Sequence, residues 1–115
     1  METLTGKWTY NEEYEHGTST GELLLQQAGA RLSGKIILSD RPREGDSCMI
    51  QEELSGKIEG KKIKLKAITF DVIHSEQPLE YALDEWFGIL VDEQTIIGTS
   101  VDARGVEGNF VFKKT

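Results

Sequence analysis

Apolar residues recur at every second position along most of the chain. In Leu32–Leu38 the even-numbered residues are apolar, and Cys48–Ile58 repeats this alternation over a longer run. A period of two is typical of a β-strand with one buried face. We therefore predict strands over Trp8–Tyr14, Glu22–Gln26, Leu32–Leu38, Cys48–Ile58, Ile63–Val72, Thr95–Val101 and Val106–Phe112.

The segment from Leu79 to Val91 fits two patterns. As a strand, its inner face would carry Leu79, Tyr81, Leu83, Phe87, Ile89 and Val91, with Glu85 as an exception. As a helix, it would carry an apolar stripe of Leu79, Ala82, Leu83, Trp86, Phe87 and Leu90, with Pro78 at the first helical position. We predict the strand, because Gly88 weakens the helix.

Two irregularities interrupt the alternation. The pattern in Ile63–Val72 slips by one residue, which predicts a β-bulge near Ala67 and Ile68. The pentapeptide Leu32-Ser-Gly-Lys-Ile36 recurs as Leu54-Ser-Gly-Lys-Ile58. Because glycine inside a strand commonly marks a bend, we expect both segments to turn a corner of a barrel wall.

Eight strands in so short a chain leave no room for long crossover connections. The strands are therefore expected to be antiparallel, in up-and-down order. A sheet of eight such strands can close on itself, which removes its edges. We predict an all-β fold, a single closed eight-stranded barrel over residues 1–115, with an interior just wide enough for side chains or one small ligand.

Loop lengths distinguish the two ends of the predicted barrel. In an up-and-down barrel alternate loops lie at opposite ends. The connections at one end are all short, over Gln27–Arg31, Glu59–Lys61 and Asp92–Gln94. Those at the other end are mostly long, over Tyr14–Ser19, Ser39–Ser47 and Ile73–Leu79, with a tight turn at Asp102–Gly105. Binding residues are often carried on long loops, so we predict that the second end is open.

The tripeptide Gly6-Lys7-Trp8 at the start of the first strand resembles the G-x-W motif of lipocalins and related calycin barrels. The resemblance implies that Trp8 closes the narrow end of the barrel beneath a basic residue of the last strand. Lys114 shares the inward parity of Phe112 and is the candidate for that residue, although the family usually has arginine there. Trp8 also lies at the end with the short loops.

Charge and composition exclude several classes of protein. The 115 residues include 20 acidic and 13 basic side chains, a net charge of −7, which argues against binding to nucleic acid or to an anionic membrane. No apolar run is long enough for a transmembrane helix, and the N-terminus does not resemble a secretory signal. The single cysteine, Cys48, cannot form an internal disulfide. We therefore expect a cytoplasmic location.

Polar side chains at inward-facing positions are the candidates for ligand binding. Glu12 and Glu52 alternate with apolar residues, and burying an unpaired carboxylate is costly. With nearby tyrosines they could line a wet cavity that binds a polar or cationic group, and an arginine at the open end could bind an anionic one. The candidate ligand-binding residues are Tyr10, Glu12, Tyr14, Leu38, Ile50, Glu52, Tyr81 and Arg104.

The residue types that usually carry catalysis lack supporting motifs. His16 and His74 have no ligands at metal-binding spacing, and Cys48 has no motif that supplies a base. We therefore predict no catalytic residue, no metal and no cofactor. The main hypothesis is noncatalytic binding of a small apolar or amphipathic molecule inside the barrel. The alternatives are a protein-binding barrel, an inhibitor or assembly partner that could homodimerise, and a small barrel enzyme such as an isomerase.

Overall fold

A computed structural model describes residues 4–45, 47–75 and 82–115 of the chain. Its eight strands are β1 (Gly6–Tyr14), β2 (Gly17–Ala28), β3 (Arg31–Pro42), β4 (Cys48–Glu59), β5 (Lys62–Ser75), β6 (Asp84–Asp92), β7 (Thr95–Asp102) and β8 (Glu107–Lys114). The contested segment is a strand over Asp84–Asp92, as predicted, and its beginning at 79–81 lies outside the described residues.

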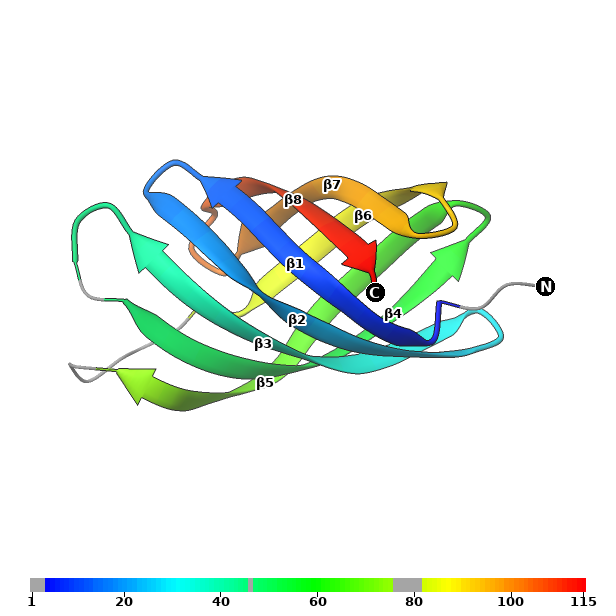
Figure 1. Cartoon of the computed structure of the whole chain (residues 1–115), viewed down its shortest axis with the longest axis horizontal. Helices are drawn as coiled ribbons and strands as arrows, with labels where there is room; N and C mark the ends of the chain where they lie inside the picture. Colours follow the sequence, from blue (N-terminus) through cyan, green and yellow to red (C-terminus); the bar gives the residue numbers. More distant parts are fainter. Residues whose placement is uncertain (1–3, 46, 76–81) are drawn as a thin grey trace.

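The strands form one closed antiparallel barrel in the order of the chain, which confirms the predicted fold. Each strand pairs with the next, and β8 returns to pair with β1. The molecule measures 45 × 25 × 23 Å, and Figure 1 shows the strands strongly tilted and the barrel elongated. Within the described ranges, no helix is long and apolar enough to cross a membrane.

The two ends of the barrel differ less in loop length than the sequence indicates. The short turns of β2–β3, β4–β5 and β6–β7 lie together, at the right in Figure 1, as predicted. At the opposite end, however, two predicted long loops are wrong. The strands β1 and β2 are separated by residues 15–16 alone, and β3 continues to Pro42. Polar residues extend the inward alternation here, so Ser19 and Asp40 belong to strands and pair with each other.

Apolar side chains fill most of the interior. Among the described residues, eighteen buried hydrophobic side chains form one cluster, which includes both tryptophans, Tyr10, Phe110 and Phe112. Burial of aromatic and branched side chains is the dominant favourable contribution to folding such a chain. Most of the length of the barrel is therefore packed with side chains, which leaves the open end as the place where a cavity can form.

Trp8 closes the narrow end, as the motif implies. Its side chain is fully buried, and its indole N–H donates to the Leu4 carbonyl over 2.9 Å. The Lys114 ammonium lies 5.9 Å from the centre of the indole ring, within the range of a cation–π contact. Gly6 allows this approach, since a Cβ atom there would lie 3.0 Å from Lys114 Cε. The expected arrangement of tryptophan under a basic residue is thus confirmed in this chain.

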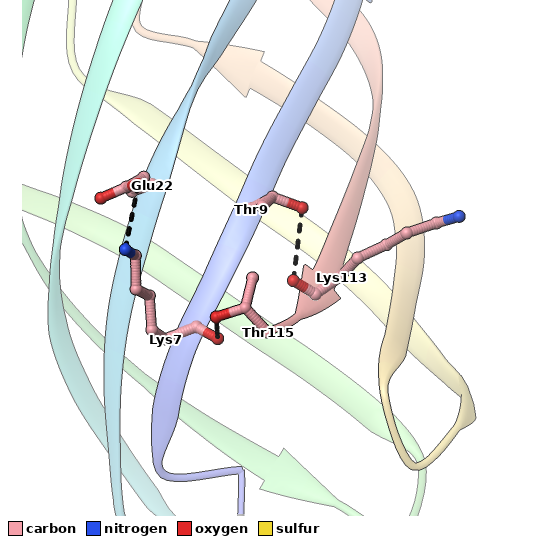
Figure 2. A network of polar contacts seen from close by, with 5 residues as sticks. All are labelled: Lys7, Thr9, Glu22, Lys113 and Thr115. Atoms are coloured by element: carbon pink, nitrogen blue, oxygen red, sulfur yellow. Dashed lines mark hydrogen bonds and ion pairs between the residues drawn. The ribbon is translucent and has the colours of Figure 1, made fainter.

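Polar contacts on the outside hold the seam between the first and last strands. Figure 2 shows the Thr9 hydroxyl donating to the Lys113 carbonyl over 3.3 Å, and the Thr115 hydroxyl donating to the Lys7 carbonyl over 3.2 Å. The Lys7 ammonium also pairs with Glu22 of β2 at 3.2 Å. These exposed contacts add little energy individually, but they connect β8, β1 and β2 where the barrel closes.

The predicted inner face of β6 is wrong. Trp86 is buried and pairs with Leu65, whereas Phe87, Ile89 and Val91 are 41%, 52% and 49% exposed. Both faces of this strand carry apolar residues, so alternation alone could not choose between them. The largest side chain, that of Trp86, faces inward. Gly88 occupies the next inward-facing position, where a larger residue would not fit, because a Cβ atom there would lie 2.7 Å from Ile96 Cγ2.

The bulge lies where the sequence predicts, and both repeated glycines lie where neighbouring strands approach closely. Glu53 pairs with Thr69 and Leu54 pairs with Ala67, so Ile68 is the extra residue of a bulge. A Cβ atom on Gly34 would lie 2.1 Å from the Leu24 carbonyl oxygen, and one on Gly56 would lie 1.9 Å from that of Lys64. Only glycine allows neighbouring strands to approach so closely.

Replacing Gly56 with alanine should therefore destabilise the barrel. The methyl group would push β4 away from β5, and such overpacking costs about 1–3 kcal/mol of unfolding free energy. Ser55→Ala, a change at the exposed neighbouring residue, is the control and should stay within about 0.5 kcal/mol of wild type. Urea unfolding followed by circular dichroism measures both variants. Equal stability of the two would show that Gly56 is not needed for the close approach.

Candidate ligand-binding site

The inward-facing side chains change from apolar to polar toward the open end. Tyr10 pairs with Gly21, which pairs with Leu38, and both Tyr10 and Leu38 belong to the core. Two residues nearer the open end, the same three strands place Glu12, Ser19 and Asp40 next to one another. Asp40 in turn pairs with Cys48 of β4. The open end is therefore lined by groups that form hydrogen bonds.

A pocket of about 250 Å³ lies above this boundary. Four carboxyl groups line it, from strands on opposite sides of the barrel, together with one guanidinium group and one phenol. These residues are Glu12, Asp40, Asp84, Asp102, Arg104 and Tyr14. With four acidic side chains and one arginine, the lining carries an excess of negative charge.

Asp40 is the centre of a small hydrogen-bond network. The Tyr14 hydroxyl donates to Asp40 Oδ1 over 2.5 Å, and the Ser19 hydroxyl donates to the same oxygen over 3.0 Å. Burial raises the pKa of Tyr14, and the bond to Asp40 raises it further. The phenol therefore keeps its proton and continues to donate at neutral pH. This network holds Tyr14 in place at one wall of the pocket.

Asp102 fixes the turn between β7 and β8. Its carboxylate oxygen Oδ1 accepts from the backbone N–H groups of Arg104, at 2.8 Å, and Val106, at 2.9 Å. Aspartate commonly accepts such bonds in turns. The turn thereby places Arg104 on the wall of the pocket.

Glu12 is half-buried and incompletely hydrogen-bonded. Burial raises the pKa of its carboxyl group, whereas hydrogen bonds with Ser100 and Tyr10 lower it. The charges of Asp40 and Asp102 raise the pKa further. Its oxygen Oε1 is buried and has no hydrogen-bond partner among the described residues. Glu12 therefore offers an unused acceptor to the pocket.

Glu52 lies deeper and is completely buried. In the described part of the chain, no N–H or O–H group donates to either of its carboxyl oxygens. Burial raises the pKa of Glu52 to about 10, with further contributions from the charges of Asp84 and Glu12. The carboxyl group of Glu52 is therefore protonated and uncharged at neutral pH.

The core beside these carboxyl groups holds another polar group. The indole nitrogen of Trp86 is buried and lacks an acceptor within the described ranges. The ring of Tyr10 contacts Trp86 edge to face at 6.3 Å between ring centres. Burial, and then the charge of Glu12, raises the pKa of Tyr10 well above its usual value. Trp86 and Tyr10 are thus neutral groups beneath a strongly acidic pocket.

The structure separates the predicted site residues into two groups. Glu12, Tyr14 and Arg104 line the pocket together. Four others are buried in the interior and do not line it, namely Tyr10, Leu38, Ile50 and Glu52. Tyr81 lies outside the described residues.

Sequence reasoning missed Asp40 and Asp84. Asp40 continues the alternation of Ile36 and Leu38, and extending that pattern by one step would have found it. Asp84 faces inward like Trp86, two residues further along β6. The predicted inner face of β6 was the opposite one, so the sequence did not indicate that Asp84 points into the barrel. Neither residue belongs to a recognisable local motif.

None of the described residues that line the pocket is an activated nucleophile. Cys48 lines it, but burial and the charge of Asp40 raise the pKa of its thiol, so the unreactive protonated form dominates at neutral pH. His16 also lines the pocket, whereas His74 of β5 pairs with Met49. Within the described ranges, no group of three or more residues could hold a metal ion. The arrangement is suited to binding by hydrogen bonds and charge.

A wider depression lies on the outside of the barrel. It has a volume of about 660 Å³, and its lining includes Arg31, Lys57 and Lys64. The first two residues pair across β3 and β4, and Lys57 pairs with Lys64 across β4 and β5. This basic surface is separate from the acidic pocket at the open end, so the two could not serve one ligand.

Comparison with known proteins identifies the architecture. No protein-family model matches the chain, and no curated protein matches it. Among solved structures, the redesigned β-barrels mFAP1 and mFAP0, each bound to DFHBI, are similar with TM-scores of 0.69 and 0.67 and 12% identity. The alignments cover 96% of this chain in both cases, and 94% and 98% of the designed chains.

A de novo designed fluorescence-activating β-barrel is also similar, with a TM-score of 0.60 and 10% identity over 97% of this chain and 94% of that one. At these identities the likeness concerns the fold alone. The chain therefore has the same overall fold as small designed barrels, two of which are bound to a ligand.

Proposed function

We propose that the protein binds a small amphipathic molecule, without catalysis, at the open end of the barrel. The observation that carries this proposal is the pocket of about 250 Å³ above a packed interior, with an unused buried acceptor on Glu12. Binding sites typically combine an apolar floor with a few convergent polar groups. The ligand-bound designed barrels support the proposal, because they show that this fold can hold a small molecule.

The packed interior limits what such a ligand can be. Drug-sized ligands occupy pockets of roughly 300–1,000 Å³, so a ligand here is smaller. A purely apolar molecule would leave the buried oxygen Oε1 of Glu12 without a donor. An amphipathic molecule matches the lining better, with its polar end toward Glu12 and its apolar part toward Val106 and Pro42.

A native mass spectrum of the freshly purified protein tests the proposal. We expect an additional mass on the wild-type protein. Val106→Trp should remove it, because Val106 lines the pocket and indole would fill the opening. Val91→Trp is the matched control, since Val91 lies on the outside near the closed end, and should keep the mass.

Two results would contradict the proposal. One is an additional mass that Val106→Trp leaves unchanged. The other is the absence of any such mass together with no binding in a screen of small amphipathic fragments by ligand-observed NMR. The cytoplasmic location and the homodimer stay predictions, and the same spectrum reports whether the protein is a dimer.

A further inference from the structure

The acidic pocket contains acceptors that its own donors do not satisfy. Asp40 accepts from Tyr14 and Ser19, and Asp102 accepts from two backbone N–H groups. By contrast, Oε1 of Glu12 is buried without a partner in the described part of the chain. A buried acceptor without a donor is costly, so a ligand that supplies donors would gain binding energy here.

A second buried carboxyl group, that of Glu52, also lacks donors. Its side chain is completely buried, and no described group donates to either oxygen. Beyond burial, the charges of Asp84 and Glu12, both of which line the pocket, raise the pKa of Glu52. Carboxyl groups from β1, β4 and β6 thus influence one another at and beneath this pocket.

We propose that the pocket binds the ammonium group of a small amphipathic amine, held by Glu12 and Asp84 above Glu52. This inference rests on the proposed function and names the class of ligand. A protonated amine brings up to three N–H donors and a positive charge, which matches the acceptors and the negative charge of the lining. An anionic ligand would meet four carboxyl groups and only one arginine.

Three probes of nearly equal size separate charge from shape. Phenethylamine is a cation at pH 7, 2-phenylethanol is neutral, and 3-phenylpropionate is an anion. Isothermal titration of the wild-type protein should give the highest affinity for phenethylamine. We expect 2-phenylethanol to bind about tenfold to a hundredfold more weakly, because a hydrogen-bonded charge is lost. No binding of the carboxylate is expected.

A pair of variants tests whether the carboxylate that binds the ammonium group lies in the pocket. Glu12→Gln keeps the shape of the side chain and removes its charge, and should weaken phenethylamine binding about tenfold or more. Glu13→Gln is the matched control, since it removes the same charge from the exposed neighbouring residue and should leave the affinity unchanged. Asp84→Asn should behave like Glu12→Gln. If a variant fails to fold, the comparison of the three probes on the wild-type protein still tests the inference.

The outcomes distinguish this inference from the proposed function. If 2-phenylethanol binds as tightly as phenethylamine, or the carboxylate binds best, the amine inference is overturned while small-molecule binding stands. Equal effects of Glu12→Gln and Glu13→Gln would also overturn it. If none of the probes binds and the native mass spectrum shows no additional mass, both the inference and the proposed function fail.

Discussion

Replacing Glu52 with glutamine should raise the stability of the protein at pH 7 by about 3 kcal/mol. The folded chain keeps Glu52 protonated because its pKa is raised to about 10, whereas the same group in the unfolded chain ionises near 4.5. Unfolding at neutral pH therefore releases a proton. The free energy of unfolding of the wild type should fall by up to about 1.4 kcal/mol per pH unit within this window.

Glutamine removes that dependence on pH because its amide group is uncharged at every pH. The amide also has nearly the same size and shape as the protonated carboxyl group that it replaces. Wild type and variant should be similarly stable near pH 4.5, and the variant should become progressively more stable as the pH rises toward 10. Urea unfolding at several pH values measures this difference.

The neighbouring residue provides the control for this experiment. Glu53 follows Glu52 on β4 and is exposed, so Glu53→Gln should change stability by less than about 0.5 kcal/mol at every pH. Parallel stability curves for wild type and Glu52→Gln would show that Glu52 is ionised in the folded protein. The protonated state of Glu52 would then be wrong.

Replacing Trp8 with alanine should cost about 3–5 kcal/mol of unfolding free energy. The indole is fully buried at the closed end, donates to the Leu4 carbonyl and lies beneath Lys114. Removing it leaves a cavity that the rigid strands cannot fill by collapsing. Trp8→Phe retains most of the ring and should cost clearly less. Thermal unfolding followed by circular dichroism measures both variants.

An exposed aromatic residue is the control for Trp8. Phe87 is 41% exposed on the outside of β6, so Phe87→Ala should cost much less than Trp8→Ala. Similar losses for the two variants would show that Trp8 does not close the core.

The Trp8 variants also provide a prediction about ligand binding. Ligand affinity of correctly folded Trp8→Phe should match wild type, because the pocket lies at the opposite end.

Local patterns were sufficient for the parts of the fold that depend on neighbouring residues. Alternation located the eight strands, and its slip at Ile68 located the bulge. The contact of Trp8 with Lys114 followed from the tripeptide at the start of the chain and from parity near its end. The inner face of β6 could not be found in this way, because Phe87 and Ile89 are as apolar as Trp86 and Leu90.

The candidate site depended on how the strands are placed against one another. Glu12 could be recognised from the alternation in its own strand. The presence of Asp84 in the same pocket, and the effect of its charge on Glu52, could not be recognised, because β6 is distant in the chain from β1 and β4.

The sequence by itself determined the all-β class, the order of the strands and the acidic character of the protein. These properties follow from local alternation, short connections and the excess of acidic side chains. Only the tertiary structure decided which carboxyl groups meet and which of them holds a proton. The physical reason is that register and strand tilt set the distances between side chains across the barrel, and burial there sets their charge.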